Sequence, residues 1–143
     1  MFKVEAQTLA PSYEPKTVNT DGFTSTVKVW QNLFLTTVII RCFLHAYINI
    51  RNVAKKLDCF GTIGDYLWDA YQQISYEAFI DKLSILQLWT GYHRKDMTDR
   101  CFQTITKVCS RAHEYAIAYG HPHCLRTSNV LDRLMQKMDR YLF

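Results

Sequence analysis

The pattern of apolar and polar residues predicts two short strands near the N-terminus, with one helix between them. Residues 17–20 (Thr-Val-Asn-Thr) are β-prone, and the run ends at Asp21 and Gly22. The β-branched run 36–41 is typical of a strand buried on both faces. Thr24 is expected to cap the helix between the strands. The apolar face of this helix would be formed by Val27, Trp30, Leu33 and Phe34.

After the second strand the chain is expected to be helical. A helix is predicted over 43–57, then a turn with two glycines over 59–64, then helices over 65–74, 76–89, 98–119 and about 129–141. Ser75 is expected to cap the helix 76–89. The helix 43–57 has an apolar side formed by Leu44, Tyr47, Ile48 and Val53. The apolar faces of 76–89 and 98–119 are formed by Phe79, Leu83, Leu86, Cys101, Ile105, Val108 and Ala112.

The predicted fold class is therefore α/β and predominantly helical. Residues 1–57 would form a β-α-β-α unit, residues 58–120 an all-α insertion, and residues 121–143 a closing segment with a C-terminal helix. Residues 1–12 show little periodicity, and Pro11 and Pro15 favour an extended or turned backbone there. Trp30, Trp68 and the phenylalanines are expected in the core.

Composition narrows the class of protein. The chain has 143 residues, of which 48% are hydrophobic, enough for one domain with its own core. No apolar run is long enough to span a bilayer and no signal peptide is visible, so we expect a cytoplasmic protein without a membrane partner. Five cysteines without a framework spacing suit reduced thiols. A net charge of +4 is compatible with a nucleic-acid partner, but it also suits an ordinary basic domain.

Two acidic residues are candidates for chemistry. Asp21 follows the first predicted strand, and ligand and metal sites of open α/β sheets gather at the carboxyl ends of strands. Asp132 lies in the first turn of the predicted C-terminal helix. The alternatives are that Asp21 is a turn residue before Gly22 and that Asp132 only interacts with the helix dipole.

Cysteine and histidine residues suggest a possible zinc site. Cys42 and His45 form a Cys-x-x-His pair, and His121, His123 and Cys124 form a second group. A structural zinc ion needs four such ligands in a closed tetrahedron. The preferred interpretation is structural, with Cys42 buried and His45 hydrogen-bonded locally.

Basic residues could contact DNA phosphates. The candidates are Arg51, Lys55, Lys56, Arg126 and Arg133. Trp89 and Tyr92 could stack on bases, and a solvated basic face is the alternative.

The motifs around these candidates resemble insertion-sequence transposases of the Mutator-like and related groups. The resemblance rests on the run 18–23 (Val-Asn-Thr-Asp-Gly-Phe), on Trp30 and Phe34, and on the Cys-x-x-His pair after the second strand. The closing segment 127–134 (Thr-Ser-Asn-Val-Leu-Asp-Arg-Leu) is similar to a family pattern of the form Thr-Thr/Ser-Asn-x-x-Glu-Arg-Leu. The order of these motifs, with a helical segment between them, carries the resemblance.

The resemblance implies an RNase H-like core of the DDE type, which uses three carboxylates and Mg²⁺ or Mn²⁺ to cleave and join DNA. Asp21 would be the second carboxylate and Asp132 the third, where many members carry Glu. The two acids together would hold the metal. DNA, as transposon ends and target, would be the substrate of a nucleoid-associated enzyme.

The first carboxylate has no counterpart before Asp21. The 20 preceding residues are too few for the first hairpin of such a core, and the acids there, Glu5 and Glu14, follow no convincing buried strand. We therefore expect a C-terminal transposase half that is inactive alone. Its partner would be the missing N-terminal half or a full-length transposase. The alternative is a non-enzymatic α-rich module that binds DNA or a transposase.

Overall fold

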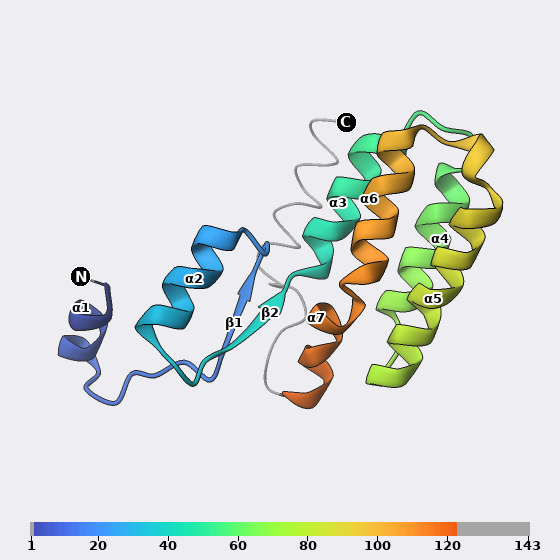
Figure 1. The fold of residues 1–143 in the computed structure, drawn as a ribbon. Coiled ribbons are helices and arrows are strands. Elements are labelled where there is room, and N and C mark those ends of the chain that lie inside the picture. Colours follow the sequence, from blue (N-terminus) through green and yellow to red (C-terminus); the bar gives the residue numbers. More distant parts are fainter. Residues whose placement is uncertain (1, 123–143) are drawn as a thin grey trace, which may run out of the picture.

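The computed structural model describes residues 2–122, in which seven α-helices accompany a two-stranded parallel sheet (Figure 1). The N-terminal part contains α1 (Phe2–Leu9), β1 (Thr17–Thr20), α2 (Thr24–Leu33) and β2 (Val38–Arg41). The remainder contains α3 (Phe43–Ala54), α4 (Phe60–Tyr71), α5 (Tyr76–Tyr92), η1 (Arg94–Asp96), α6 (Asp99–Ser110), α7 (Ala112–Ala116) and η2 (Ile117–Gly120).

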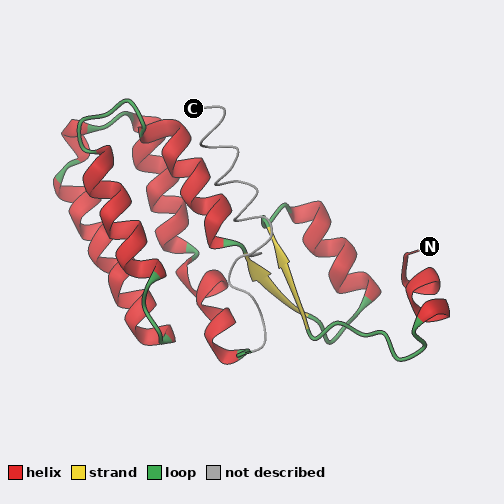
Figure 2. Ribbon diagram, turned by 180° about the vertical axis from the view of Figure 1, so that it is seen from behind, coloured by secondary structure: helices red, strands yellow, loops and turns green. Residues whose placement is uncertain are grey.

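The strands β1 and β2 form a βαβ unit, residues 17–41, in which α2 is the crossover helix. Their pairing is in parallel register from Thr17 opposite Val38 to Thr20 opposite Arg41. Seen from both sides, the strands lie between α2 and the bundle formed by the later helices (Figures 1 and 2). Because both strands run in the same direction, their carboxyl ends meet at one edge of the pair. Asp21 and Cys42 therefore leave the sheet side by side.

The helices α3 to α7 pack around one hydrophobic core, and we call this part, residues 43–120, the helical bundle. Each helix contributes apolar residues at three- and four-residue spacing, which places them on one face. The most deeply buried side chains of the bundle are those of Ile50, Ile63, Leu67, Leu83, Leu86, Thr90, Cys101 and Ile105. The hydroxyls of Ser75 and Thr98 accept hydrogen bonds from the backbone N–H of Ala78 and Cys101, which caps α5 and α6.

The structure confirms the main elements expected from the pattern. The fold is α/β and predominantly helical, β1 covers residues 17–20, and Ser75 caps α5. The predicted apolar faces of α5 and α6 are buried in the core. The predicted helix over 129–141 lies outside the described residues. Within residues 2–122, no helix combines the length and the apolar character that crossing a membrane requires.

Several local predictions are wrong. Residues 59–64 are not a turn, because α4 begins at Phe60 and buries Ile63, and this burial outweighs the cost of two helical glycines. The first residues form α1 rather than an extended segment. Thr24 does not cap α2; the cap is Phe23, without a side-chain bond.

The long helix predicted over 98–119 is divided. The α-helix ends at Ser110, Arg111 has φ −103° and ψ 17°, and α7 begins at Ala112. No glycine or proline explains the break, although Tyr115 beyond it stays buried in the same core.

The buried face of α3 also differs from the prediction. The core contains Phe43, Ala46, Ile50 and Ala54, while Leu44 and Ile48 are only half-buried. The predicted Tyr47 and Val53 are partly buried and pack against this core, whereas Leu44 and Ile48 are not part of it. Trp68 and Phe23, both expected in the core, are 59% and 64% exposed.

Candidate functional site

Asp21 lies immediately after β1, on the surface. One carboxylate oxygen, Oδ1, accepts a hydrogen bond of 2.9 Å from the backbone N–H of Phe23. This bond closes a turn of the Asx type and fixes the carboxylate at the start of α2. The group is exposed and forms no ion pair with residues 2–122, so it remains able to bind a cation from solvent.

Arg41 at the end of β2 covers the backbone of this turn. Its Nη1 and Nη2 atoms lie 3.5 Å from the carbonyl oxygens of Asp21 and Gly22. Gly22 has φ 85°, a left-handed conformation that disfavours other residues, and a Cβ there would collide with the guanidinium. Both the backbone angle and the contact therefore require glycine next to the candidate carboxylate.

An ion pair joins the βαβ unit to the helical bundle. Nε of Arg41 donates to Oε2 of Glu114 in α7 over 2.6 Å, with 18% and 37% of the two side chains exposed. The neighbouring Tyr115 is buried. This burial raises the pKa of Tyr115 to about 12, although the charges of Arg41 and Arg111 act in the opposite direction. The positive charge at the strand ends is thus partly neutralised by Glu114.

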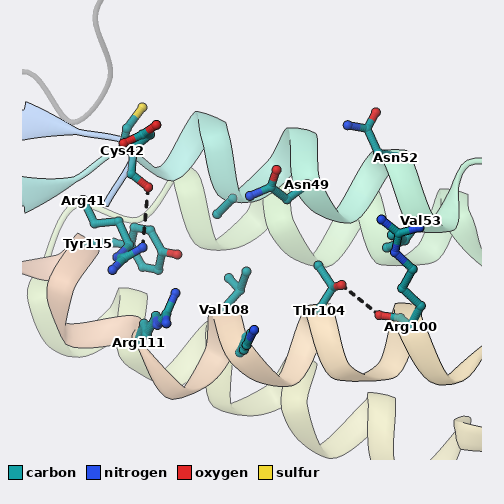
Figure 3. Close-up of a pocket in the computed structure, with 13 residues that line it drawn as sticks. Arg41, Cys42, Asn49, Asn52, Val53, Arg100, Thr104, Val108, Arg111 and Tyr115 are labelled. Carbon is teal, nitrogen blue, oxygen red and sulfur yellow. Dashed lines mark hydrogen bonds between the residues drawn. The ribbon is translucent and has the colours of Figure 1, made fainter. Parts of the chain in front are cut away.

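From this point a groove runs between α3 and α6 and encloses about 350 Å³ (Figure 3). Arg41, Tyr115 and Arg111 lie at one end of it, and Arg100 lies at the other, beside Val53. Its complete lining is Asp21, Arg41, Cys42, Ala46, Asn49, Asn52, Val53, Arg100, Thr104, Lys107, Val108, Arg111 and Tyr115. The candidate carboxylate is therefore part of a polar, basic groove rather than an isolated surface group.

The candidate DNA-binding residues in the last turn of α3 and just after it lie outside this groove. Arg51, Lys55 and Lys56 are absent from its lining. Arg126 and Arg133 lie outside the described residues, as does the proposed third carboxylate, Asp132. Among the acids predicted to act, the structure thus locates Asp21 alone.

The candidate zinc ligands are only partly described. Cys42 is buried at the end of β2, and Nδ1 of His45 is buried without a hydrogen-bond partner among residues 2–122, so the local hydrogen bond expected for His45 is not formed at this atom. Over residues 2–122, no three His, Cys, Asp or Glu side chains come together as a metal site would require. His123 and Cys124 lie outside the described residues.

Three basic residues of the groove were missed by sequence reasoning. Arg100, Lys107 and Arg111 each precede an apolar core residue of the 98–119 segment by one position, namely Cys101, Val108 and Ala112. This regular offset was visible in the sequence, because it places the three cations along one border of the apolar stripe. The sequence pattern does not show that α3 faces this border across a groove.

Comparisons with known proteins identified no related protein. No protein-family model, no curated protein and no solved structure matched the chain.

Proposed function

We propose that the chain is part of a DDE-type transposase, namely the back half of an RNase H-like core with a helical insertion. The parent reaction would be the cleavage and joining of DNA by metal-assisted transesterification. The observation that carries the proposal is the position of Asp21. It is an exposed carboxylate at the carboxyl end of the first strand of a parallel βαβ unit, followed by the helix α3 and the rest of the bundle.

The two-stranded sheet is consistent with a partial core. Parallel sheets are usually larger and covered on both faces, and isolated two-stranded pairs are marginal. Within residues 2–122, β1 pairs with β2 only. In the proposed enzyme, a further strand carrying the first carboxylate would come from a chain segment outside these 143 residues. Without it we expect no cleavage activity.

The residues present fit one part of a metal site. Asp21 offers a fixed, solvent-facing carboxylate, and hard ions such as Mg²⁺ and Mn²⁺ prefer oxygen ligands. A complete site would need Asp132 and the first carboxylate as well. Divalent metal in such a site supplies activation of the attacking oxygen and stabilisation of the leaving oxygen. The chain's own part is to hold Asp21 in position through the Phe23 N–H and the Arg41 contacts.

The test begins with the DNA upstream of the codon for Met1, translated in three frames. We expect a strand-like run that carries an acid, and joining it to this chain should give cleavage of element-end DNA with Mg²⁺. Asp21→Asn and Asp132→Asn should each lower that rate by at least about 100-fold, because carboxylate-bound metal contributes several kcal/mol to the barrier reduction. Asp58→Asn, which alters an exposed acid away from the groove, is the matched control. Normal cleavage by Asp21→Asn would refute the catalytic assignment.

A second candidate is a non-enzymatic α-rich module that binds DNA or a transposase. The observation that favours it is the basic groove, which does not depend on Asp21 being a metal ligand. This candidate predicts that Asp21→Asn leaves all function intact, whereas loss of groove cations does not. The enzyme and the binding module are therefore distinguished by the effect of Asp21→Asn.

A further inference from the structure

The groove between α3 and α6 carries positive charge that the surrounding described residues do not neutralise. Arg41 is paired with Glu114. Within residues 2–122, Arg100, Lys107 and Arg111 form no ion pair, and Asp21 is the acidic member of the described lining. A cleft lined by one sign of charge concentrates its field and raises the local concentration of opposite charges. The ligand of this groove should therefore be anionic.

The spacing of the cations indicates an extended ligand. Arg100 and Lys107 are seven residues apart along α6, which corresponds to about 10 Å at 1.5 Å per residue, and Arg111 follows four residues later. Arg100 and Lys107 lie on the same border of the apolar stripe of α6, and Arg111, the residue at which this helix ends, follows on that side. Arg100 and Arg111 lie at opposite ends of the groove, so one phosphate or carboxylate ion would leave at least one of them without an anionic partner. A chain of regularly spaced anions can pair with both.

The opposite wall offers neutral hydrogen-bonding groups. Asn49 and Asn52 on α3 are exposed and line the groove (Figure 3). Side-chain amides both donate and accept, so they can bind phosphate oxygens, sugars or base edges. The apolar members of the lining are Ala46, Val53 and Val108, which suit the apolar faces of sugars better than a second charged surface.

The chain's own C-terminal segment is a poor electrostatic match for the groove. Residues 123–143 contain more basic than acidic side chains, with Arg126, Arg133, Lys137 and Arg140 against Asp132 and Asp139. A cationic segment would be repelled by Arg100, Lys107 and Arg111. The sequence therefore favours an external polyanion.

We propose that this groove binds the sugar-phosphate backbone of one DNA strand, with Arg100, Lys107 and Arg111 as phosphate contacts and Asn49 and Asn52 on the facing wall. The choice of DNA rests on the proposed function. Because Arg41 lies at one end of the groove and its Nη1 is 3.5 Å from the carbonyl oxygen of Asp21, a strand bound along the groove passes the candidate carboxylate. The groove thus supplies the substrate-positioning surface for that site, on residues distinct from the candidate metal ligands.

The test measures binding without catalysis. Fluorescence anisotropy would follow a labelled 30-nucleotide single strand, and separately its duplex, with the 143-residue chain in EDTA. The variant carrying Arg100→Ala, Lys107→Ala and Arg111→Ala should bind at least about tenfold more weakly. Its slope of log K against log salt should become shallower by about 2, since each lost phosphate contact on a single strand contributes about 0.7.

A matched control removes the same charge elsewhere. Lys16, Lys28 and Lys95 are exposed and lie outside the groove, so their simultaneous change to alanine should weaken binding less than threefold. Circular dichroism would verify that both triple variants are folded, and the single reversal Lys107→Glu provides a second, less extensive change. Equal weakening by the two triple variants, or parent-like binding by the groove variant, would overturn the proposal.

Two further measurements identify the ligand and distinguish the groove assignment from the catalytic assignment of Asp21. Polyglutamate of matched charge should compete much less well than unlabelled DNA, and equal competition would refute the assignment to a DNA backbone. Asp21→Asn should bind DNA at least as tightly as the parent chain. If the joined enzyme needs Asp21 while the groove variant still binds, the groove assignment alone fails. If the groove variant loses binding while Asp21→Asn cleaves normally, the catalytic proposal alone fails.

Discussion

The βαβ unit and the helical bundle differ sharply in the number of side chains that each buries. The bundle contains a continuous core drawn from five helices, in which Ile50, Ile63 and Leu86 have no exposed surface. In the βαβ unit the buried side chains are those of Thr20, Phe34, Thr37 and Ile40, and its two strands have four residues each. A sheet of this size is not independently stable. The unit that carries the candidate carboxylate therefore depends on the bundle for its stability.

The candidate site is divided between these two parts of the molecule. The bundle supplies a rigid groove wall from α3 and α6, and the βαβ unit supplies Asp21 and Arg41 at the groove's end. The ion pair between Arg41 and Glu114 and the direct continuation from β2 into α3 join the two parts. Binding and chemistry can thus be perturbed separately. Segments with few buried contacts also open at lower free energy than the core.

The largest expected effect comes from the bundle core. Leu86→Ala removes a fully buried side chain of α5 and should lower the free energy of unfolding by about 2–5 kcal/mol, because it leaves a cavity. Urea unfolding followed by the helical circular dichroism signal measures this loss. Leu88→Ala, on the same helix but 65% exposed, should change stability by less than about 0.5 kcal/mol. Similar losses for the two variants would mean that the bundle core is not where the stability resides.

A smaller effect, confined to the other region, is expected from Gly22→Ala. The left-handed backbone costs an L-residue about 1–2 kcal/mol, and the new Cβ must also displace the Arg41 guanidinium. Hydrogen exchange should show faster opening of β1 and β2, with little change in α5 and α6.

The matched control for Gly22→Ala is Gly64→Ala. Gly64 lies inside α4, where a Cβ meets no atom within 4 Å, so this change should stabilise the bundle by about 0.5–1 kcal/mol. Opposite signs for the same substitution would sharpen the distinction between the regions. A uniform effect on exchange throughout the chain would show that the two regions unfold together.

The smallest expected effect is the contribution of the Tyr115 hydroxyl to the pH dependence of the bundle between pH 8 and pH 10. Burial raises the pKa of the Cys109 thiol and of the Tyr115 hydroxyl to about 12, from ordinary values of 9.0 and 10.0. The unfolded chain then loses these protons first, so stability is complete below pH 9 and falls as the pH rises toward 12. Below pH 10, Tyr115 should contribute less than about 1 kcal/mol of this fall.

Tyr115→Phe separates that contribution. Urea unfolding at pH 8 and pH 10 should show a smaller decrease for the variant than for the parent chain. An identical decrease in both would mean that the Tyr115 hydroxyl is not buried in its neutral form.

The sequence predicted the elements that depend on local patterns. The run 17–20 became β1, Ser75 caps α5, and the apolar stripe of α6 is buried, because each follows from spacing or capping chemistry. The sequence-based predictions were wrong where tertiary packing determines the local structure. The glycines at 61 and 64 became helical because Ile63 and Leu67 are buried against other helices, which no local rule reveals.

The candidate site was predictable only in part. Asp21 could be named because it ends a β-prone run before glycine. The groove could not be found in this way, because it needs the face of α3, whose inner side was assigned to the wrong residues, and its alignment with α6. The position of Arg41 over Gly22 depends on the register of β1 and β2, which likewise is not a local property.

The contact between Arg41 and Gly22 has an evolutionary consequence. A side chain at position 22 would demand both a different backbone and a different position for the guanidinium, so neither residue can change alone without cost to the turn that holds Asp21. In any set of related sequences, position 22 should therefore remain glycine wherever this turn is kept, whether or not Arg41 is present. A lineage in which Arg41 has been replaced has lost the cover of the turn at Asp21, but the turn itself still selects glycine at position 22 through its backbone angle.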